Sequence, residues 1–184
     1  MEKWEIISEE DVSPDKWFPV SKHVVRLPNG IVVDDYYLSP IGDVVMILPI
    51  TKGKKIVLVK QYKHGVGEVI IELPAGFKKE GISYQQTAVE ELEEEVGIRV
   101  NVKNLISLGK LASNPTKLTS SIHGFLAKDL EFNSIQNLEV TEDIEIVEVT
   151  PDEAIKMIDR GEIWASDSVA FIFMLKHKYP EYFK

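Results

Sequence analysis

The stretch from Glu72 to Ile98 constrains the fold more than any other part of the chain, because it combines a strand end, a loop and a helix. Pro74 and Gly76 interrupt an apolar segment, and both residue types predict a turn or loop at that point. From Ser83 to Val96 apolar side chains recur at the spacing of a helix. Ser83 is a typical N-cap residue and Gly97 a typical stop, so we predict one well-defined helix between them.

The C-terminal half of this predicted helix carries an unusual density of carboxylates: Glu90, Glu91, Glu93, Glu94 and Glu95. Acidic side chains there oppose the helix dipole and repel one another. No lysine or arginine lies between Ser83 and Ile98. At 100° per residue, Glu91, Glu94 and Glu95 share one face, which is how a helix presents oxygen ligands to Mg²⁺ or Mn²⁺. The alternative is a solvated acidic face without a ligand.

The spacing of seven residues resembles the Nudix box, in which a glycine is followed by the pattern R-E-U-x-E-E-x-G-U with U aliphatic. These residues are Gly76, Glu91, Leu92, Glu94, Glu95, Gly97 and Ile98. The flanking segments 61–65 (QYKHG) and 72–76 (ELPAG) resemble the ADP-ribose pyrophosphatase branch of that family. The resemblance extends from about residue 20 to the C-terminus.

Two positions depart from the box. The family's glutamate six residues after the glycine is replaced by Ile82, and its arginine before the first paired glutamate is replaced by Glu90. In the family that arginine helps to orient the glutamates and is commonly paired with an acidic residue of the box. The departures therefore indicate either that a supporting ion pair is missing while the main ligands remain, or that activity has been lost.

The resemblance implies an α/β/α sandwich with a mixed β-sheet, whereas periodicity alone supports only a mixture of α and β structure. It also implies metal-dependent hydrolysis of the pyrophosphate bond of ADP-ribose or a related nucleoside diphosphate sugar. The products would be AMP, or another nucleoside monophosphate, and a sugar phosphate. Carboxylates that hold Mg²⁺ or Mn²⁺ suit this reaction, because bound ions neutralise phosphate charge and lower the pKa of bound water.

By the same resemblance, Glu91 and Glu95 are the expected main metal ligands. Glu94 is an auxiliary ligand that also belongs to the catalytic set, and the carbonyl of Ala75 is a further ligand. In the family a glutamate just before a late strand reaches into the metal site as a base or an extra ligand. Glu142 is the matching candidate and Glu139 the second. For both, ordinary acidic loop residues remain the alternative.

Five residues are candidate substrate contacts: Trp17, Arg26, Lys60, Lys63 and Gly76. Lys60 and Lys63 stand where related enzymes often carry arginines, and lysine keeps the charge but lacks the bidentate fork. A solvated strand surface is the alternative for both lysines. Trp17 is a candidate for packing, with adenine stacking as the second interpretation.

Short β-type segments at 4–7, 17–18, 22–26 and 31–33 predict a small N-terminal lobe. Pro28-Asn29-Gly30 predicts a hairpin between the last two. We assign residues 1–40 to this lobe and 41–184 to a Nudix domain. In related dimeric enzymes the lobe crosses to the partner subunit, so we expect a homodimer, although an extra sheet of a monomer fits the same pattern.

Further along, the pattern predicts strands at 44–50, 55–62, 69–73, 121–127 and 142–149, a strand pair at 100–111 and a polar loop at 128–141. Helices are expected at 151–160, with Thr150 as N-cap and Pro151 at the first position, and at 166–177.

Composition narrows the classes of function. The chain of 184 residues contains no cysteine, which excludes disulfides, thiolate metal sites and a cysteine nucleophile and favours a cytoplasmic protein. A net charge of −9 argues against binding to nucleic acid or anionic membrane. No apolar run is long enough to span a bilayer, and the N-terminus does not resemble a signal peptide.

Three functional interpretations follow. The first is an active pyrophosphatase. The second is a degenerate Nudix protein that binds ADP-ribose or a nucleotide sugar as a sensor without turnover, as Ile82 and Glu90 would allow. The third is an interaction module that has kept only the fold, and the retained Glu91, Glu94 and Glu95 disfavour it.

Overall fold

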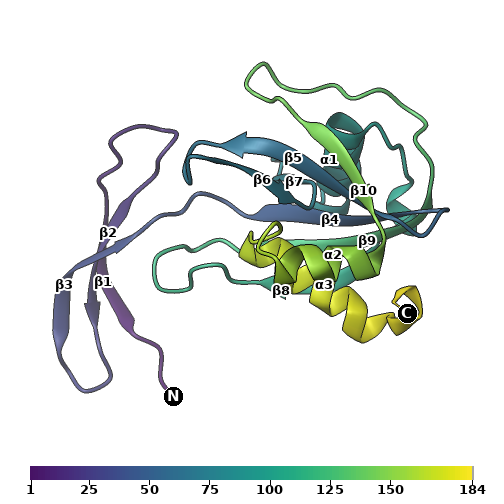
Figure 1. Ribbon diagram of the computed structural model, residues 1–184. Helices are drawn as coiled ribbons and strands as arrows, with labels where there is room; N and C mark the ends of the chain where they lie inside the picture. Colours follow the sequence, from purple (N-terminus) through teal and green to yellow (C-terminus); the bar gives the residue numbers. More distant parts are fainter. Residues whose placement is uncertain (184) are drawn as a thin grey trace. The chain divides into compact units, whose positions relative to one another are not determined.

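The computed structural model describes residues 1–183, and the chain divides into two compact units. The N-terminal unit comprises residues 1–43 and 112–121, and the C-terminal unit comprises 44–111 and the chain from 122 onward. Figure 1 labels the helices and strands of both units. Within residues 1–183, no helix is long and apolar enough to cross a membrane.

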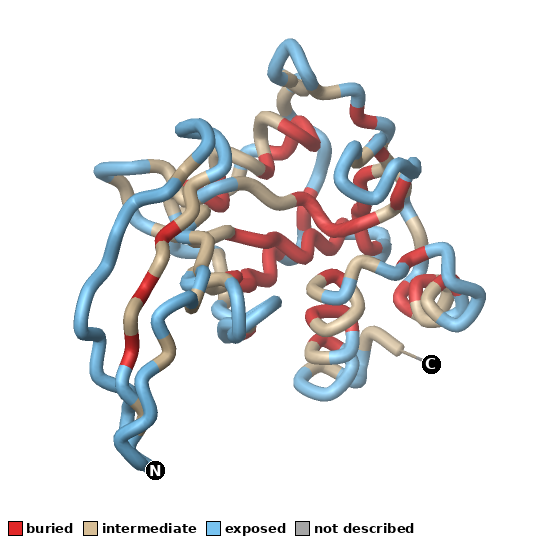
Figure 2. Tube along the Cα trace, turned by 90° about the vertical axis from the view of Figure 1, so that its left-hand side faces the viewer, coloured by how far each residue is buried: buried red, intermediate tan, exposed pale blue. Residues whose placement is uncertain are grey.

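The N-terminal unit contains an antiparallel sheet with the order β1 (Glu5–Asp11), β2 (Ser21–Arg26) and β3 (Val32–Leu38). The predicted hairpin between β2 and β3 is confirmed. Its turn is closed by the N–H of Leu27, which donates to the Ile31 carbonyl at 2.8 Å. Gly30 adopts a φ of 85°, a value that favours glycine. Every residue of the edge strand β1 is exposed, whereas alternate residues of β2 are buried (Figure 2).

The strand expected at residues 17–18 is wrong. Asp15 and Phe18 form only an isolated bridge, and the Asp15 carboxylate accepts a hydrogen bond from the N–H of Trp17 at 2.9 Å. This local bond between side chain and backbone favours a turn over an extended strand. Residues 112–121 join the same unit, where the Tyr36 hydroxyl donates to the Thr116 carbonyl at 2.9 Å.

The C-terminal unit is built on a mixed sheet, as predicted. Its main path runs β10-β5-β4-β9-β8, and β6 pairs with β5 while β7 pairs with β4. β4 and β9 are parallel and the other pairs are antiparallel. The strands are β4 (Val44–Thr51), β5 (Ile56–Lys63), β6 (Glu68–Glu72), β7 (Ala75–Phe77), β8 (Ile106–Leu111), β9 (Ile122–Leu130) and β10 (Glu145–Val149).

Alternation of side chains along the central strands creates two hydrophobic cores, one on each face of the sheet. On β4, Met46 and Leu48 belong to one core and Val45 and Ile47 to the other. The first core is covered by α2 (Pro151–Asp159) and α3 (Ser166–Lys178), and the second by α1 (Tyr84–Val96). Figure 1 shows α1 behind the sheet and the other two helices in front of it. The expected α/β/α sandwich is therefore confirmed.

The helix α1 has the predicted ends. The Ser83 hydroxyl accepts a hydrogen bond from the N–H of Gln86 at 3.0 Å. At the other end Gly97 has a φ of 75° and its N–H donates to the Glu93 carbonyl at 2.9 Å. Between the caps, Leu92 and Val96 are buried in the core, so capping and burial together fix the position of the helix.

Two sequence predictions need correction. In place of a strand pair at 100–111, the chain forms a short 3₁₀ turn, Val102–Asn104, before the single strand β8. The Asn101 side chain caps that turn by accepting from the N–H of Lys103 at 3.1 Å. The loop expected at 128–141 begins later, because β9 continues to Leu130, which is buried against the core.

The two C-terminal helices begin and end within a few residues of the predicted positions. The Thr150 hydroxyl accepts from the N–H of Glu153 at 3.2 Å, which confirms it as the N-cap of α2. On α3, Phe171 is fully buried above Gly124 of β9, where a Cβ would lie 2.1 Å from the ring. The absence of a side chain at Gly124 thus allows α3 to pack closely on the sheet.

Candidate active site

A cleft of about 610 Å³ lies in the C-terminal unit beside β7 and α1. Its lining comes from segments far apart in the sequence and is mostly charged; it includes Lys63, Glu72, Ala75, Gly76, Lys79, Glu91, Glu95, Glu139, Glu142 and Asp167. An adjoining hollow of about 290 Å³ shares several of these residues and adds Glu94. The structure therefore brings the predicted metal ligands together with both predicted base candidates.

The turn between β6 and β7 fixes the position of one carboxylate. The N–H of Ala75 donates to Oε2 of Glu95 at 3.0 Å, and the Pro74 carbonyl accepts from the N–H of Ile47 at 2.9 Å. The strand turn is thus bonded both to the central strand β4 and to the helix. Since Glu95 is only 3% exposed, its carboxylate is held at the floor of the cleft.

Gly76 has a steric role at this position. A Cβ on Gly76 would lie 2.3 Å from the Glu91 carboxyl group, so only glycine allows that carboxylate to lie against β7. Gly76 pairs with Val45 of β4, which fixes its backbone. The glycine of the box is therefore explained by the space that Glu91 needs.

Two carboxyl groups of α1 have raised pKa values. Burial raises the pKa of Glu95 to about 8, the N–H of Ala75 opposes this change, and the charges of Glu91 and Glu142 add to it. Burial also raises the pKa of Glu91, although the ammonium of Lys79 works in the opposite direction. Burial and mutual repulsion disfavour the ionised form of these carboxyl groups, and a bound cation would offset both effects.

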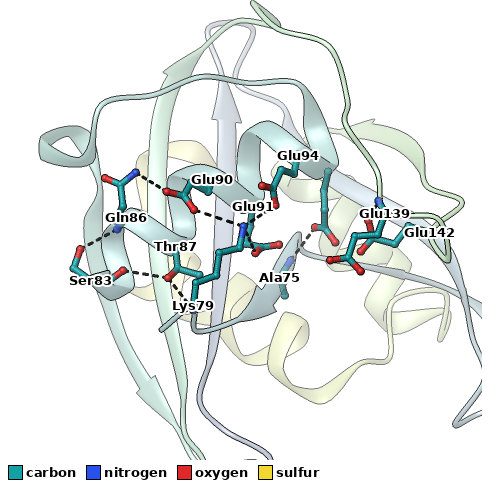
Figure 3. A network of polar contacts seen from close by, with 11 residues as sticks. Ala75, Lys79, Ser83, Gln86, Thr87, Glu90, Glu91, Glu94, Glu139 and Glu142 are labelled. Atoms are coloured by element: carbon teal, nitrogen blue, oxygen red, sulfur yellow. Dashed lines mark hydrogen bonds and ion pairs between the residues drawn. The ribbon is translucent and has the colours of Figure 1, made fainter. Parts of the chain in front are cut away.

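The side chain of Lys79 lies among the helix carboxylates, as Figure 3 shows. Its Nζ is 2.8 Å from Oε2 of Glu94, 3.2 Å from Oε1 of Glu91 and 3.6 Å from Oε2 of Glu90. Partial burial disfavours the charged ammonium, but the contacts with Glu94 and Glu91 outweigh this and raise the pKa of Lys79.

The sequence did not predict Lys79 as a site residue, because only the charges within the predicted helix were considered. Lys79 belongs to the loop that precedes α1, and its N–H donates to the Thr87 hydroxyl at 3.2 Å. Its position three residues after Gly76 was the available signal. The carboxylates of α1 are therefore compensated from outside the helix.

Glu139 and Glu142 reach the cleft from the loop between β9 and β10. The N–H of Glu139 donates to Oε2 of Glu142 at 2.9 Å, so the two residues form one local turn. The loop is attached to the end of α1, because the N–H of Asn137 donates to the Glu94 carbonyl at 2.9 Å and Nε2 of Gln136 donates to the Glu95 carbonyl at 2.7 Å.

The cleft is also lined by Lys63, whose Nζ is 3.2 Å from Oε1 of Glu72. Gln61 also donates to Oε1 of Glu72, at 3.1 Å, and burial raises the pKa of Glu72. Sequence reasoning did not select Glu72 or Asp167 as site residues. Asp167 comes from the first turn of α3, and no sequence spacing connected it to the box.

Three of the candidate substrate contacts are not among the residues that line the cleft. Lys60 pairs with Glu145 at 2.9 Å and is not among the residues that line the cleft. Arg26 and Trp17 belong to the N-terminal unit, where Arg26 pairs with Glu5 at 2.9 Å and Trp17 is 82% exposed.

The cleft offers mainly carboxylate oxygens as ligands, and hard divalent cations prefer oxygen ligands of this kind. Within residues 1–183, however, no three acidic or histidine side chains converge as ligands of one ion. The ammonium of Lys79 lies between the carboxylates of Glu91 and Glu94 instead.

The raised pKa of Glu95 predicts a pH-dependent stability in the metal-free protein. Between its ordinary pKa and about 8, the unfolded chain releases a proton that the folded chain retains. The free energy of unfolding should therefore fall as the pH rises through this window, with a slope from this group of at most about 1.4 kcal/mol per pH unit. Urea unfolding with a chelator between pH 5 and 8 should show a smaller fall for Glu95→Gln. Equal slopes for the two proteins would contradict the assignment.

Comparison with known proteins places this geometry in a family. Residues 40–170 match the NUDIX domain, and residues 4–39 match the nucleoside diphosphate sugar hydrolase N-terminal domain. An ADP-ribose pyrophosphatase of Bacillus subtilis (strain 168) is 30% identical over 173 residues, which cover 94% of this chain and 92% of that protein. A methanol dehydrogenase activator of Bacillus methanolicus is 33% identical over 154 residues, covering 83% and 81%.

A solved structure described as an ADP compounds hydrolase shares the fold. Its TM-score is 0.86 at 23% identity, and the match covers 98% of this chain and 96% of that one. The domain match spans most of the chain, and Gly76, Glu91 and Glu95 of the box line one cleft. The chain therefore belongs to the Nudix hydrolase family.

Proposed function

We propose that the chain hydrolyses the pyrophosphate bond of ADP-ribose or a related nucleoside diphosphate sugar, giving AMP or another nucleoside monophosphate and a sugar phosphate. One observation carries this proposal: Glu91 and Glu95 of α1 share one cleft with Glu139 and Glu142, which come from a loop more than forty residues further along the chain. Relatives named ADP-ribose pyrophosphatase, and a mouse protein named ADP-sugar pyrophosphatase that is 31% identical over 107 residues, support the substrate class.

Each carboxylate has a proposed task. Glu91 and Glu95 would hold Mg²⁺ or Mn²⁺, with Glu94 and the Ala75 carbonyl as further ligands. Such an ion, when bound, supplies positive charge for the phosphates and lowers the pKa of its bound water. The hydrogen bond from the Ala75 N–H keeps the Glu95 carboxylate in position to bind the ion.

Proton transfer is assigned to the loop. Glu142 is the proposed base that accepts the proton of the attacking water, with Glu139 as the second candidate. The bond from the Glu139 N–H orients the Glu142 carboxylate at the cleft. A general base must lie within hydrogen-bond reach of the proton that it accepts, and a carboxylate with a fixed position at the cleft suits this requirement.

The substrate contacts are proposals of unequal strength. Lys63 lines the cleft and brings a positive charge to it, so it is the preferred phosphate contact. Gly76 lines the cleft as well. Lys60 is engaged by Glu145, which makes it a weaker candidate. Arg26 and Trp17 remain proposed contacts of the N-terminal unit.

A second function, binding of the nucleotide sugar as a sensor without turnover, is favoured by one observation. The ammonium of Lys79 lies where the carboxylates would hold a metal ion, and the box lacks its usual arginine and glutamate at Glu90 and Ile82.

We further propose a cytoplasmic location without a nucleic acid or membrane partner, on the basis of the absence of cysteine and the net charge of −9.

The primary test is product release from ADP-ribose with Mg²⁺ and with Mn²⁺, with the products separated by chromatography. We expect AMP and ribose 5-phosphate, and no products after chelation. Glu95→Gln should lower kcat by more than about 100-fold, since losing a ligand costs more than losing one of its supporting contacts. Glu148→Gln, which removes an exposed carboxylate of β10, is the matched control and should retain activity. Metal-dependent binding without any cleavage would establish the sensor instead.

Gly76→Ala tests the geometry of the site without removing a charge. Its Cβ would overlap the Glu91 carboxylate, which must move, and the end of a flexible side chain moves without loss of the fold. We expect Mn²⁺ affinity to fall by about 10- to 100-fold with little change in melting temperature. Gly65→Ala is the control, because a Cβ there meets no atom within 4 Å. An unchanged affinity in Gly76→Ala would refute the role of Glu91.

We also propose that the protein is a homodimer formed through its N-terminal unit. The exposed side chains of this unit include many large apolar ones: Trp4, Ile6, Ile7, Val12, Trp17, Phe18, Ile31 and Val32. A soluble monomer seldom exposes so much apolar surface in one small unit. Sedimentation equilibrium should therefore give about twice the chain mass of 20.8 kDa, and Ile6→Asp should shift the equilibrium towards the monomer. A monomer at micromolar concentration would contradict the proposal.

A further inference from the structure

We propose that Lys79 is a built-in counter-cation of the carboxylate cluster, and that it withdraws from Glu91 and Glu94 towards Glu90 when a divalent ion binds. The inference rests on the proposed metal-binding function and assigns a regulatory element within the same site. Lys79 is thus a positioning residue that competes with the metal ion.

The contacts of Lys79 support this role. Its Nζ is within 3.2 Å of Glu91 and Glu94, the two carboxylates that the proposed function assigns to the metal, and 3.6 Å from Glu90. An ammonium and a divalent cation repel each other and cannot use the same carboxylate oxygens. An ion bound at Oε1 of Glu91 and Oε2 of Glu94 would therefore break the Lys79 contacts with both carboxylates, while the contact with Glu90 can persist.

The cluster requires such a cation when no metal is bound. Glu94 lies four residues after Glu90 and three after Glu91, near the negative end of the helix, and Glu91 is largely buried. Without compensation these charges would destabilise α1 at its contact with the sheet. Lys79 neutralises part of this charge from the preceding loop.

The loop holds Lys79 in a defined place. The N–H of Lys79 donates to the hydroxyl of the fully buried Thr87, and that hydroxyl in turn donates to the Ser83 carbonyl at 3.2 Å. The backbone of Lys79 is thereby attached to the first turns of α1, and its side chain extends along the helix to the carboxylates (Figure 3). The contact is built into the capped start of the helix.

Glu90 provides the resting position for the displaced ammonium. It stands where the box usually has an arginine, and Nε2 of Gln86 donates to its Oε1 at 2.9 Å, which fixes its carboxylate beside Lys79. The positive charge that the box usually carries on the helix is therefore moved to the loop, and an acidic partner takes its place. Lysine suits an exchangeable contact, because it is a point charge on a flexible stem with no fixed fork.

The experiment compares Mn²⁺ binding, followed by electron paramagnetic resonance, in the wild type, Lys79→Met, Lys79→Arg and Lys52→Met. Methionine keeps the length of the side chain but removes the charge. Lys79→Met should bind Mn²⁺ about tenfold more tightly, because the two partly exposed ion pairs with Glu91 and Glu94 no longer oppose metal binding. Its metal-free form should melt at a lower temperature than the wild type.

Two controls separate competition from a change in net charge. Lys79→Arg keeps the charge and should bind Mn²⁺ no more tightly than the wild type. Lys52→Met removes one charge and one ion pair, with Glu131 at 2.9 Å, elsewhere in the same unit, and should leave the affinity unchanged. The same tightening in Lys52→Met as in Lys79→Met would overturn the proposal, because it would reflect net charge alone.

The remaining outcomes also decide between hypotheses. An equal or weaker Mn²⁺ affinity in Lys79→Met, with the wild type binding normally and Glu95→Gln impaired, would overturn the role of Lys79 and leave the proposed function intact. If neither the wild type nor Lys79→Met binds Mn²⁺, the metal-dependent function itself fails, and this inference fails with it.

Discussion

The hydrogen bond from the Ala75 N–H to the Glu95 carboxylate is the contact on which the rest of the site depends. It joins the turn after β6 to the last turns of α1, and it does so inside the protein, where Glu95 is almost fully buried. A buried carboxylate without such a donor would strongly disfavour the folded state. With it, the helix is held against β7, Gly76 faces Glu91, and the loop attached to the end of α1 brings Glu139 and Glu142 to the cleft.

Much of this arrangement was predictable because local and global signals agree along the strand-loop-helix segment. Ser83 and Gly97 fix the ends of α1 by short-range hydrogen bonds that the sequence shows directly. The spacing of Glu91, Glu94 and Glu95 gave their common direction on the helix. The apolar runs along β4 and β5 likewise predicted strands, and the structure divides their residues between two cores.

The predictions that were wrong or missing have two physical causes. Either a local hydrogen bond from a side chain to the backbone replaced the expected strand, or tertiary packing brought in a residue that is distant in the sequence. At residues 17–18 and near Asn101, a side chain bonds to the neighbouring backbone and forms a turn where the residue types favour a strand. Asp167 reaches the cleft from α3 and Lys79 from the loop before α1, and neither position follows from periodicity. Tertiary packing alone brings these charges to one place.

The glutamates of α1 show how a conflict with local rules marks a functional site. Five carboxylates near the negative end of a helix lower its stability, and a sequence shaped for stability alone would place lysine or arginine among them. This chain places its cation on the loop instead, within reach of Glu90, Glu91 and Glu94. A cation on the helix would face these carboxylates permanently, whereas one on a flexible stem can exchange partners. Under the proposed function, the Lys79 contact stabilises the helix in the absence of metal and is weak enough to be replaced when an ion binds.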